Sequence, residues 1–223
     1  MIRTREEWER YLTVRGVFWF HDGNPKRPHA LLTEGGHSSG FFNGGLIAFD
    51  DIRTANDMCS DLAELALPWI QSFGKSPIKI VGPEYGAVSI AVLLAVHLGL
   101  PYALVRPEGE GENKIVKMDK RFKLDGMKVL RVEDTITTGG TIKKTRPVCE
   151  ERGGKMFEVI CAWCNRSGKT MIDGGTICAL IDKHMPVWDP QKGEPCPLCA
   201  QGSEAIRPKG DEGRNWKRLI AAY

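Results

Sequence analysis

Short apolar segments alternate with helical patterns through the middle of the chain. The apolar runs have the length of strands and cover residues 78–81, 102–106, 128–132, 157–163 and 177–182. Apolar residues at helical spacing lie between some of these runs, over residues 86–98 and 140–152. Strands that alternate with helices, and are themselves continuously apolar, predict an α/β fold with a parallel sheet covered by helices on both faces.

The segments before this pattern are less regular. Residues 3–14 have helical spacing, and strand-like pieces surround Phe18 and Phe41. We expect Thr54 to cap a helix that runs to about residue 73, since apolar residues then recur on one helical face.

The last part of the chain changes character at Lys183. It contains prolines, two cysteines and a short final helix predicted over residues 215–222. We therefore expect a core with N-terminal hood elements over residues 1–182, followed by a C-terminal tail over residues 183–223.

Composition and charge restrict the class of protein. Hydrophobic residues make up 42% of the 223 residues and charged residues 26%, which is typical of a soluble globular protein. The formal net charge of +3 gives little reason to expect a nucleic acid or membrane partner. The longest apolar run, residues 90–100, is too short to span a bilayer, and the charged N-terminus lacks the apolar core of a signal peptide. Seven cysteines without a secretory signal predict reduced thiols and a cytoplasmic location.

The stretch VLRVEDTITTGGT, residues 129–141, carries the most specific chemistry. An apolar strand ends in Glu133 and Asp134, where ligands bind in a parallel sheet. Gly139 and Gly140 stand where a helix begins, and the N-terminus of a helix attracts phosphate. Carboxylates instead accept hydrogen bonds from sugar hydroxyls or bind Mg²⁺ and its waters. The stretch therefore predicts a sugar-phosphate site, and a merely structural glycine-rich turn is the alternative.

This stretch is similar along its whole length to the signature of type I phosphoribosyltransferases, which use 5-phosphoribosyl 1-diphosphate (PRPP). The resemblance implies a parallel five-stranded core with helices on both faces and a small hood subdomain that holds an acceptor base. It also implies that Glu133 and Asp134 hold the ribose hydroxyls and Mg²⁺. The implied 5-phosphate loop comprises Thr135, Ile136, Thr137, Thr138, Gly139, Gly140 and Thr141.

Three further stretches resemble the orotate branch of this family: LLTEGGHSSGFFN (31–43), VGPEYGAVSIAVLLAVHLGLP (81–101) and CNRSG (164–168). In the first, Phe41 or Phe42 is a candidate to stack on a planar base, with core packing as the alternative. In the third, Arg166 is a candidate to bind a carboxylate, unless it is a surface arginine. The second implies a diphosphate-binding turn, or a purely structural one, made of Gly82, Pro83, Glu84, Tyr85 and Gly86.

The segment VRPEGEGENK departs from the orotate branch. Arg106 is kept as a catalytic candidate, but Pro107 replaces a paired lysine. Glu110 and Glu112 stand where the family has a loop lysine and histidine, and Thr33 replaces a hood lysine. Candidates to supply the missing positive charge, unless they are simply solvated, are Lys114, Lys117, Lys120 and Arg121.

Two hypotheses for the function follow. The first is a homodimeric, Mg²⁺-dependent transferase of pyrimidine nucleotide metabolism, which moves ribose 5-phosphate from PRPP to a planar, orotate-like base and releases diphosphate. The second, favoured by the altered loop, is a regulatory protein that binds PRPP without transfer. The sequence contains no helix-turn-helix pattern that would attach such a regulator to DNA.

Two cysteine pairs have the spacing of metal ligands. Cys161 and Cys164 lie in a predicted strand, where they point to opposite faces, so we expect buried core thiols. Cys196 and Cys199 lie among prolines and form a candidate zinc knuckle, which would make the tail an interaction module. A zinc site there needs two more ligands, and only His184 is near in sequence; otherwise the pair is buried or a reduced dithiol.

Overall fold

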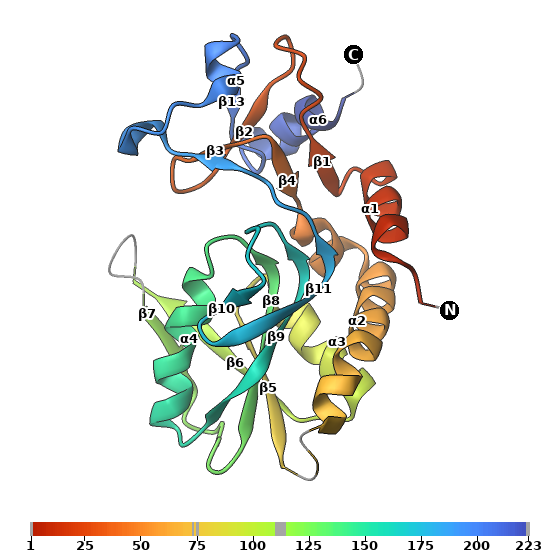
Figure 1. Cartoon of the computed structure of the whole chain (residues 1–223), viewed down its shortest axis with the longest axis vertical. Coiled ribbons are helices and arrows are strands. Elements are labelled where there is room, and N and C mark those ends of the chain that lie inside the picture. The colour runs from red at the N-terminus through yellow and green to blue at the C-terminus, as the bar shows by residue number, and fades with distance from the viewer. Residues whose placement is uncertain (1, 73, 75, 110–114, 222–223) are drawn as a thin grey trace. The chain divides into compact units, whose positions relative to one another are not determined.

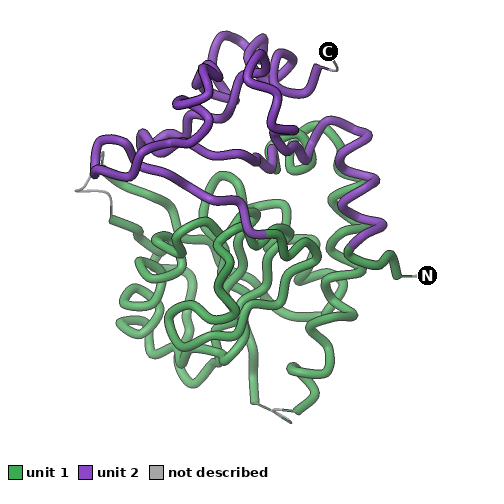
Figure 2. The backbone as a smooth tube through the Cα atoms, turned by 45° about the horizontal axis from the view of Figure 1, so that its top comes forward, with its two compact units in different colours: residues 1–5, 44–183 green, residues 6–43, 184–223 purple. Residues whose placement is uncertain are grey.

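The computed structural model describes residues 2–72, 74, 76–109 and 115–221. The chain divides into two compact units, coloured separately in Figure 2. Unit 1 comprises residues 1–5 and 44–183, and unit 2 comprises residues 6–43 and 184–223. The C-terminal residues therefore fold together with the N-terminal ones, and unit 1 lies between these two segments in the sequence.

Unit 1 is built on a mostly parallel sheet (Figure 1). The strand order is β10-β11-β9-β8-β5-β6-β7 in the described part of the chain. The strands are β5 (Ile78–Pro83), β6 (Tyr102–Glu108), β7 (Ile115–Met118), β8 (Lys128–Ile136), β9 (Lys155–Asn165), β10 (Met171–Ile172) and β11 (Gly175–Asp182). The inner strands β11, β9, β8, β5 and β6 pair in parallel, whereas β10 and β7 are antiparallel edge strands. The predicted parallel core is confirmed.

Helices cover both faces of this sheet, as predicted. They are α2 (Ile52–Ser72), α3 (Val88–Leu98) and α4 (Gly140–Glu151), and a short π-helix, η1 (Leu46–Asp50), precedes α2. Helix α2 packs on α3, β9 and β11, α3 on β5, β6 and β8, and α4 on β7, β8 and β9. Figure 1 shows α4 on the opposite side of the sheet from α2 and α3.

The α4 face of the sheet contains apolar side chains that are almost fully buried. Val81, Val105 and Val129 pack there with Cys149 of α4. Burial of one such aliphatic side chain stabilises the fold by about 1.5–3 kcal/mol. Cys161 and Cys164 of β9 are also fully buried, which confirms the prediction that they are core thiols.

The prediction that Thr54 caps α2 is wrong, because Thr54 lies inside the helix. Asp51 precedes the first residue of α2, and its carboxylate accepts hydrogen bonds from Thr54 N at 3.1 Å and from Thr54 Oγ1 at 2.7 Å. An aspartate in this position satisfies an otherwise unpaired amide of the first helical turn.

Unit 2 contains short strands and helices. They are α1 (Arg5–Val14), β1 (Phe18–Phe20), β2 (His29–Leu31), β3 (His37–Ser38), β4 (Gly40–Phe42), β12 (Val187–Trp188), η3 (Pro190–Lys192), α5 (Pro197–Ala200), β13 (Ala205–Ile206), η4 (Asp211–Gly213) and α6 (Arg214–Ile220). Strands β1 and β4 form an antiparallel pair. A second sheet has the order β12-β3-β2-β13 among the described residues. Its inner strands come from the N-terminal segment and its outer strands from the tail, so the hood elements and the tail share one sheet.

No helix within the described residues combines the length and the apolar character needed to cross a bilayer.

Candidate active site

The stretch of residues 129–141, called the signature stretch below, has the predicted strand–turn–helix form. Strand β8 ends at Ile136 and α4 begins at Gly140. Gly139 has φ +79°, and a Cβ atom there would lie 2.7 Å from Ile172 Cγ2, so only glycine fits this turn. Gly139 caps α4 without a side-chain hydrogen bond. The amide of Gly140 donates to Thr138 Oγ1 at 3.4 Å, a long hydrogen bond, and the N-terminus of α4 carries the partial positive charge that binds phosphate.

The predicted phosphate loop differs in exposure from residue to residue. Thr137, Thr138, Gly140 and Thr141 are exposed, and Thr135 is half-buried. Ile136 is 1% exposed and packs in the core beneath α4. Ile136 therefore anchors the loop, and the hydroxyl and amide groups around it are the ones that face solvent.

The two acids at the end of β8 have different environments. Glu133 is 9% exposed, whereas Asp134 is half-buried. Burial, with the neighbouring Asp134 carboxylate as the next cause, raises the pKa of Glu133 well above its usual value. Asp134 Oδ1 accepts a hydrogen bond from the amide of Thr135 at 2.7 Å. The buried Glu133 carboxyl is therefore harder to ionise than an ordinary glutamate, while Asp134 presents oxygens at an accessible position.

The signature stretch and the turn of residues 82–86, called the diphosphate turn below, lie against each other. A Cβ atom on Gly86 would lie 3.0 Å from Asp134 Oδ2 and 3.2 Å from Asp134 Oδ1. The contact joins the carboxyl end of β8 to the segment between β5 and α3. Residues 48 positions apart in the sequence are thus brought together at the carboxyl edge of the sheet, where α/β proteins bind their ligands.

The diphosphate turn is held close to β6. The amide of Glu84 donates to the carbonyl oxygen of Val105 at 2.7 Å, next to Arg106. Gly82 has no room for a side chain, since a Cβ atom would lie 2.9 Å from both Ala91 and Val132. Pro83 ends β5, the peptide between Glu84 and Tyr85 is cis, and Tyr85 is exposed. The close packing at Gly82 brings α3 directly behind the turn.

A charged network that the sequence analysis did not predict supports the signature stretch. Arg131 of β8 is fully buried; it is paired with the carboxylate of Asp173 and donates to the carbonyl oxygen of Ile142 at 3.3 Å. Arg146 of α4 donates to the same Asp173 carboxylate at 2.7 Å. Because Ile142 and Arg146 both belong to α4, the network ties the start of this helix to β8 and to the β10–β11 turn.

The basic residues of the β6–β7 hairpin are paired with an acid. Arg106 lies opposite Lys117 across the hairpin. Glu108 bonds to both, with Oε1 3.2 Å from Arg106 Nη2 and Oε2 2.5 Å from Lys117 Nζ. Lys120 is exposed, and Arg121 is paired with Asp119 at 2.9 Å. The other loop positions named above, Glu110, Glu112 and Lys114, lie outside the described residues.

Arg166 follows β9 and is not a surface arginine, since it is only 3% exposed. Its amide donates to the carbonyl oxygen of Ile136 at 3.0 Å, so its backbone is joined to the signature stretch. Burial lowers the pKa of its guanidinium from the ordinary value to about 10, and the group stays charged at neutral pH.

Phe41 and Phe42 belong to unit 2. Phe42 is 3% exposed and packs edge-on against Phe18, with ring centroids 6.4 Å apart, so core packing describes this residue. Phe41 is half-buried and packs against Trp216 of α6, with centroids 5.6 Å apart. A role for Phe41 in base binding stays a prediction.

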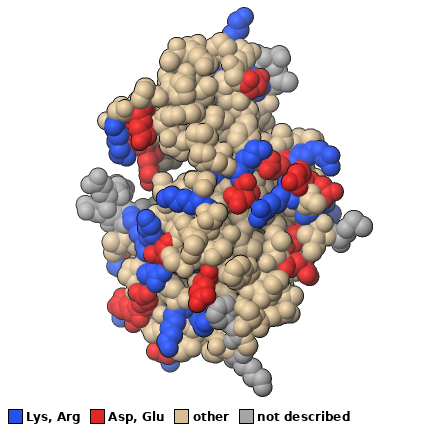
Figure 3. Space-filling view, in the orientation of Figure 1, with Lys and Arg blue, Asp and Glu red and all other residues tan. Residues whose placement is uncertain are grey.

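Positive and negative side chains are mixed on the surface. On the face that Figure 3 shows, lysines and arginines alternate with aspartates and glutamates. This distribution agrees with the small net charge of +3.

The carboxyl edge of the five-strand parallel core thus combines a carboxylate pair, a helix N-terminus and a glycine turn. Comparison with known proteins identifies the class of protein. Residues 49–203 match the phosphoribosyl transferase domain family. The chain therefore belongs to the phosphoribosyltransferase family.

Individual relatives identify the branch. The chain is 32% identical to the orotate phosphoribosyltransferase of Caldicellulosiruptor bescii over 81% of its own length and 87% of the relative's. It is 30% identical to the orotate phosphoribosyltransferase of Thermotoga maritima over 81% and 89% of the two chains. The crystal structure of orotate phosphoribosyltransferase from Aeropyrum pernix superposes with a TM-score of 0.57 and 22% identity over 78% and 92% of the chains, which supports the fold. The protein is thus a type I phosphoribosyltransferase of the orotate branch, and an enzyme.

Proposed function

We propose that this enzyme transfers ribose 5-phosphate from PRPP to a nitrogen of a planar, orotate-like base, with Mg²⁺, and releases diphosphate. The contact of Asp134 with Gly86 carries the proposal. It joins the acids suited to a ribose diol to the turn suited to a diphosphate, and both are continuous with the α4 N-terminus suited to a 5-phosphate. These are the three parts of PRPP in their chemical order.

Asp134 and Glu133 have different roles in binding the ribose. The Asp134 side-chain oxygens accept hydrogen bonds from the ribose hydroxyls, and the half-buried position of this residue leaves it open to solvent and ligand. Burial and the neighbouring Asp134 raise the pKa of Glu133, which disfavours a second negative charge beside the phosphates. The pair therefore binds the diol with less repulsion of the anionic substrate than two carboxylates would cause.

Mg²⁺ is the ion implied by the family, and the residues present fit it in part. Asp134 offers accessible carboxylate oxygens next to the diphosphate turn, and Mg²⁺ is commonly bound by one or two carboxylates together with substrate phosphates. Glu133 is the poorer ligand, because it is 9% exposed and burial raises the pKa of its carboxyl. When bound, the ion would neutralise charge on the departing diphosphate.

The remaining groups bind the base and neutralise the leaving group. Arg166 is buried from solvent and would bind a carboxylate or carbonyl group of the base. Arg106, next to the residue that holds Glu84, would stabilise negative charge as the bond from C1 of the ribose to the diphosphate breaks. Catalysis then results from holding the base and PRPP in position and from the fixed positive charges of Arg166 and Arg106.

The test is release of diphosphate from PRPP in the presence and absence of Mg²⁺, with orotate first and then other pyrimidine and purine bases. We expect Mg²⁺-dependent release with orotate and formation of the nucleotide. Binding of PRPP in a calorimeter without release for any base would instead establish the non-transferring regulator and refute the transferase.

A pair of variants tests the acids. We expect Glu133→Gln combined with Asp134→Asn to lose at least about 3 kcal/mol of transition-state stabilisation, roughly a hundredfold in kcat/KM. The matched control is Glu151→Gln combined with Glu158→Gln, which removes two exposed acids of unit 1 and should leave kcat/KM unchanged. Near wild-type turnover of the first pair would contradict the assigned roles.

We also propose a homodimer and a cytoplasmic location. All seven cysteines are free thiols, which supports a reducing compartment. The dimer rests on the resemblance to the family and is tested by the mass of the protein in solution.

A further inference from the structure

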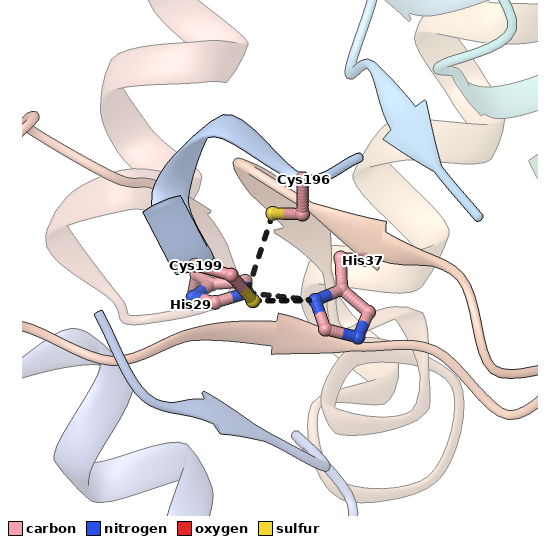
Figure 4. Close-up of side chains that lie close together, drawn as sticks. All are labelled: His29, His37, Cys196 and Cys199. Atoms are coloured by element: carbon pink, nitrogen blue, oxygen red, sulfur yellow. Dashed lines mark hydrogen bonds between the residues drawn. The ribbon is translucent and has the colours of Figure 1, made fainter. Parts of the chain in front are cut away.

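Four side chains with metal-ligating atoms converge within unit 2. They are His29, His37, Cys196 and Cys199, and one ligand atom from each lies within 4.8 Å of the others. Figure 4 shows the thiols and imidazoles pointing toward one another. None of these four residues belongs to the signature stretch or the diphosphate turn of unit 1.

The distances between these atoms match the edges of a metal tetrahedron. His29 Nε2 lies 3.0 Å from His37 Nδ1, 3.6 Å from Cys196 Sγ and 3.5 Å from Cys199 Sγ, and Cys199 Sγ lies 3.2 Å from His37 Nδ1. Zn²⁺ has bonds of about 2.0–2.3 Å to nitrogen and sulfur, so its tetrahedral edges are roughly 3.3–3.8 Å. Four of the six distances between the ligand atoms therefore lie within a few tenths of an ångström of a tetrahedral edge, and the other two are at most 4.8 Å.

The fold explains how distant residues meet. His29 starts β2 and His37 starts β3, two paired strands of the N-terminal segment. The cysteines flank the start of α5, which the tail inserts between β12 and β13. Because β13 pairs with β2, with Ala205 opposite His29, the cysteine turn is carried over the histidine pair.

A hydrogen-bond relay fixes the tautomer of His29. Its Nδ1 lies 2.8 Å from Ser203 Oγ, and Ser203 Oγ donates to the carbonyl oxygen of Arg27 at 2.6 Å. Since the hydroxyl proton is directed at this carbonyl, Ser203 accepts from Nδ1–H and leaves the lone pair of Nε2 facing the cluster. Outer partners of this kind orient metal-bound histidines.

We propose that unit 2 binds one Zn²⁺ through His29 Nε2, His37 Nδ1, Cys196 Sγ and Cys199 Sγ. Two thiolates and two imidazoles in a tetrahedron are a ligand set for zinc, whereas Mg²⁺ and Ca²⁺ require oxygen ligands. Four protein ligands fill the coordination sphere, so the ion has a structural role and joins the tail to the β2–β3 hairpin. The proposal does not depend on the transferase function of unit 1.

The histidine nearest to the cysteines in sequence, His184, is not one of these ligands and is exposed. The site is also reachable by a metal ion. A cavity of about 700 Å³ is lined by His37, Cys196 and Cys199 together with residues such as Leu31 and Arg207. Metal can therefore exchange without unfolding of the whole unit.

The first experiment is elemental analysis of the full-length protein purified without added metal or chelator. We expect one zinc per chain. After removal of zinc and titration with Co²⁺, we expect the intense visible bands of tetrahedral cobalt and a thiolate-to-cobalt charge-transfer band. Absence of both zinc and the tetrahedral cobalt spectrum in the wild-type protein would overturn the proposal.

Variants with matched controls locate the ligands. Cys199→Ser and His37→Ala alter exposed or half-buried side chains, and each is expected to reduce the zinc content to less than about one tenth, since even outer-shell changes cost 10–100-fold in affinity. Cys178→Ser and His184→Ala remove a thiol and an imidazole outside the cluster and should retain one zinc. Full zinc content in Cys199→Ser, or loss of zinc in His184→Ala, would contradict the proposed site. If a variant fails to fold, the cobalt spectrum of the wild-type protein still tests whether the site exists.

Discussion

Replacement of Asp173 by asparagine should destabilise unit 1 strongly although the residue lies in a short surface turn. Asp173 is the carboxylate partner of Arg131, whose side chain is only 1% exposed. The backbone of Asp173 has φ +49°, and asparagine adopts this left-handed conformation readily, so the substitution removes charge with little backbone strain.

The expected cost follows from the remaining contacts of the two arginines. Removal of one partner of a buried ion pair costs about 3–5 kcal/mol, because a charge is left uncompensated. The carbonyl oxygen of residue 173 still accepts hydrogen bonds from Arg131 Nη2 at 3.2 Å and from Arg146 Nη2 at 2.5 Å. The Asp173 side chain is also 19% exposed, which favours the lower end of the range. We therefore expect a loss of about 3 kcal/mol in the free energy of unfolding, or roughly 6–12 °C in Tm.

The effect should also depend on pH. Burial opposes ionisation of Asp173, but hydrogen bonds from Arg146 and Arg131 outweigh it and lower the pKa of the carboxyl. A depressed pKa stabilises the folded state at every pH above the unfolded value of about 4, and this contribution is lost as the pH falls through the folded value. The difference between wild-type protein and Asp173→Asn should thus be constant near neutrality and shrink below about pH 4.

Urea unfolding followed by circular dichroism measures the loss, and amide hydrogen exchange over residues 137–151 locates it. The control is Glu150→Gln, which removes the exposed partner of Arg146 at 3.0 Å and should cost only about 0.3–0.5 kcal/mol. A cost below about 1 kcal/mol for Asp173→Asn, or the same exchange rates at the start of α4, would refute the view that this network holds the signature stretch.

Three further substitutions test other contacts. Gly86→Ala places a methyl group 3.0 Å from Asp134 Oδ2 and forces the carboxylate to shift. We expect kcat/KM to fall about tenfold without a change in Tm, since misplacement of a catalytic group by 1 Å costs about a hundredfold in rate. Unchanged kinetics would show that Asp134 moves freely. Glu108→Gln releases the two basic side chains of the β6–β7 hairpin that it pairs with, and it should lower the KM for PRPP by up to about fivefold, less at high salt. A higher KM would mean that Glu108 itself supports binding. Ser203→Ala removes the acceptor of His29 Nδ1 and should weaken zinc affinity about 10–100-fold in a competition titration with a chelator; equal affinity would exclude the relay.

The sequence was sufficient to predict the parallel core and the order of its elements. Strands β5, β8 and β9 contain apolar runs because both of their faces are covered, and this pattern distinguishes them from surface strands. Strand β7 was not predicted, because its residues Ile115–Met118 lie in a highly charged connection and only two of them are buried. Its pairing with β6 is a tertiary contact that local composition does not encode.

The functional residues could be predicted where they lie close together in the sequence. The signature stretch contains its acids, hydroxyls and glycines within thirteen residues, so its form follows from local rules. Arg131 lies in the same stretch, yet its burial depends on Asp173, 42 positions away. The zinc ligands are a stronger case, since 167 positions separate His29 from Cys196 and only the pairing of β13 with β2 brings them together. The spacing of Cys196 and Cys199 indicates two metal ligands. The other two ligands, His29 and His37, lie in an irregular segment and have no recognisable motif.

The sheet of unit 2 has a consequence for the order in which the protein is made. Its inner strands β2 and β3 leave the ribosome before unit 1, and its outer strands β12 and β13 leave after it. Unit 1 can complete its parallel core while the β2–β3 hairpin still lacks both neighbours, and an isolated hairpin is at best marginally stable in water. The sheet of unit 2 therefore forms late, once β12 and β13 have been made, and capture of a metal ion by the two histidines and two cysteines would mark its completion.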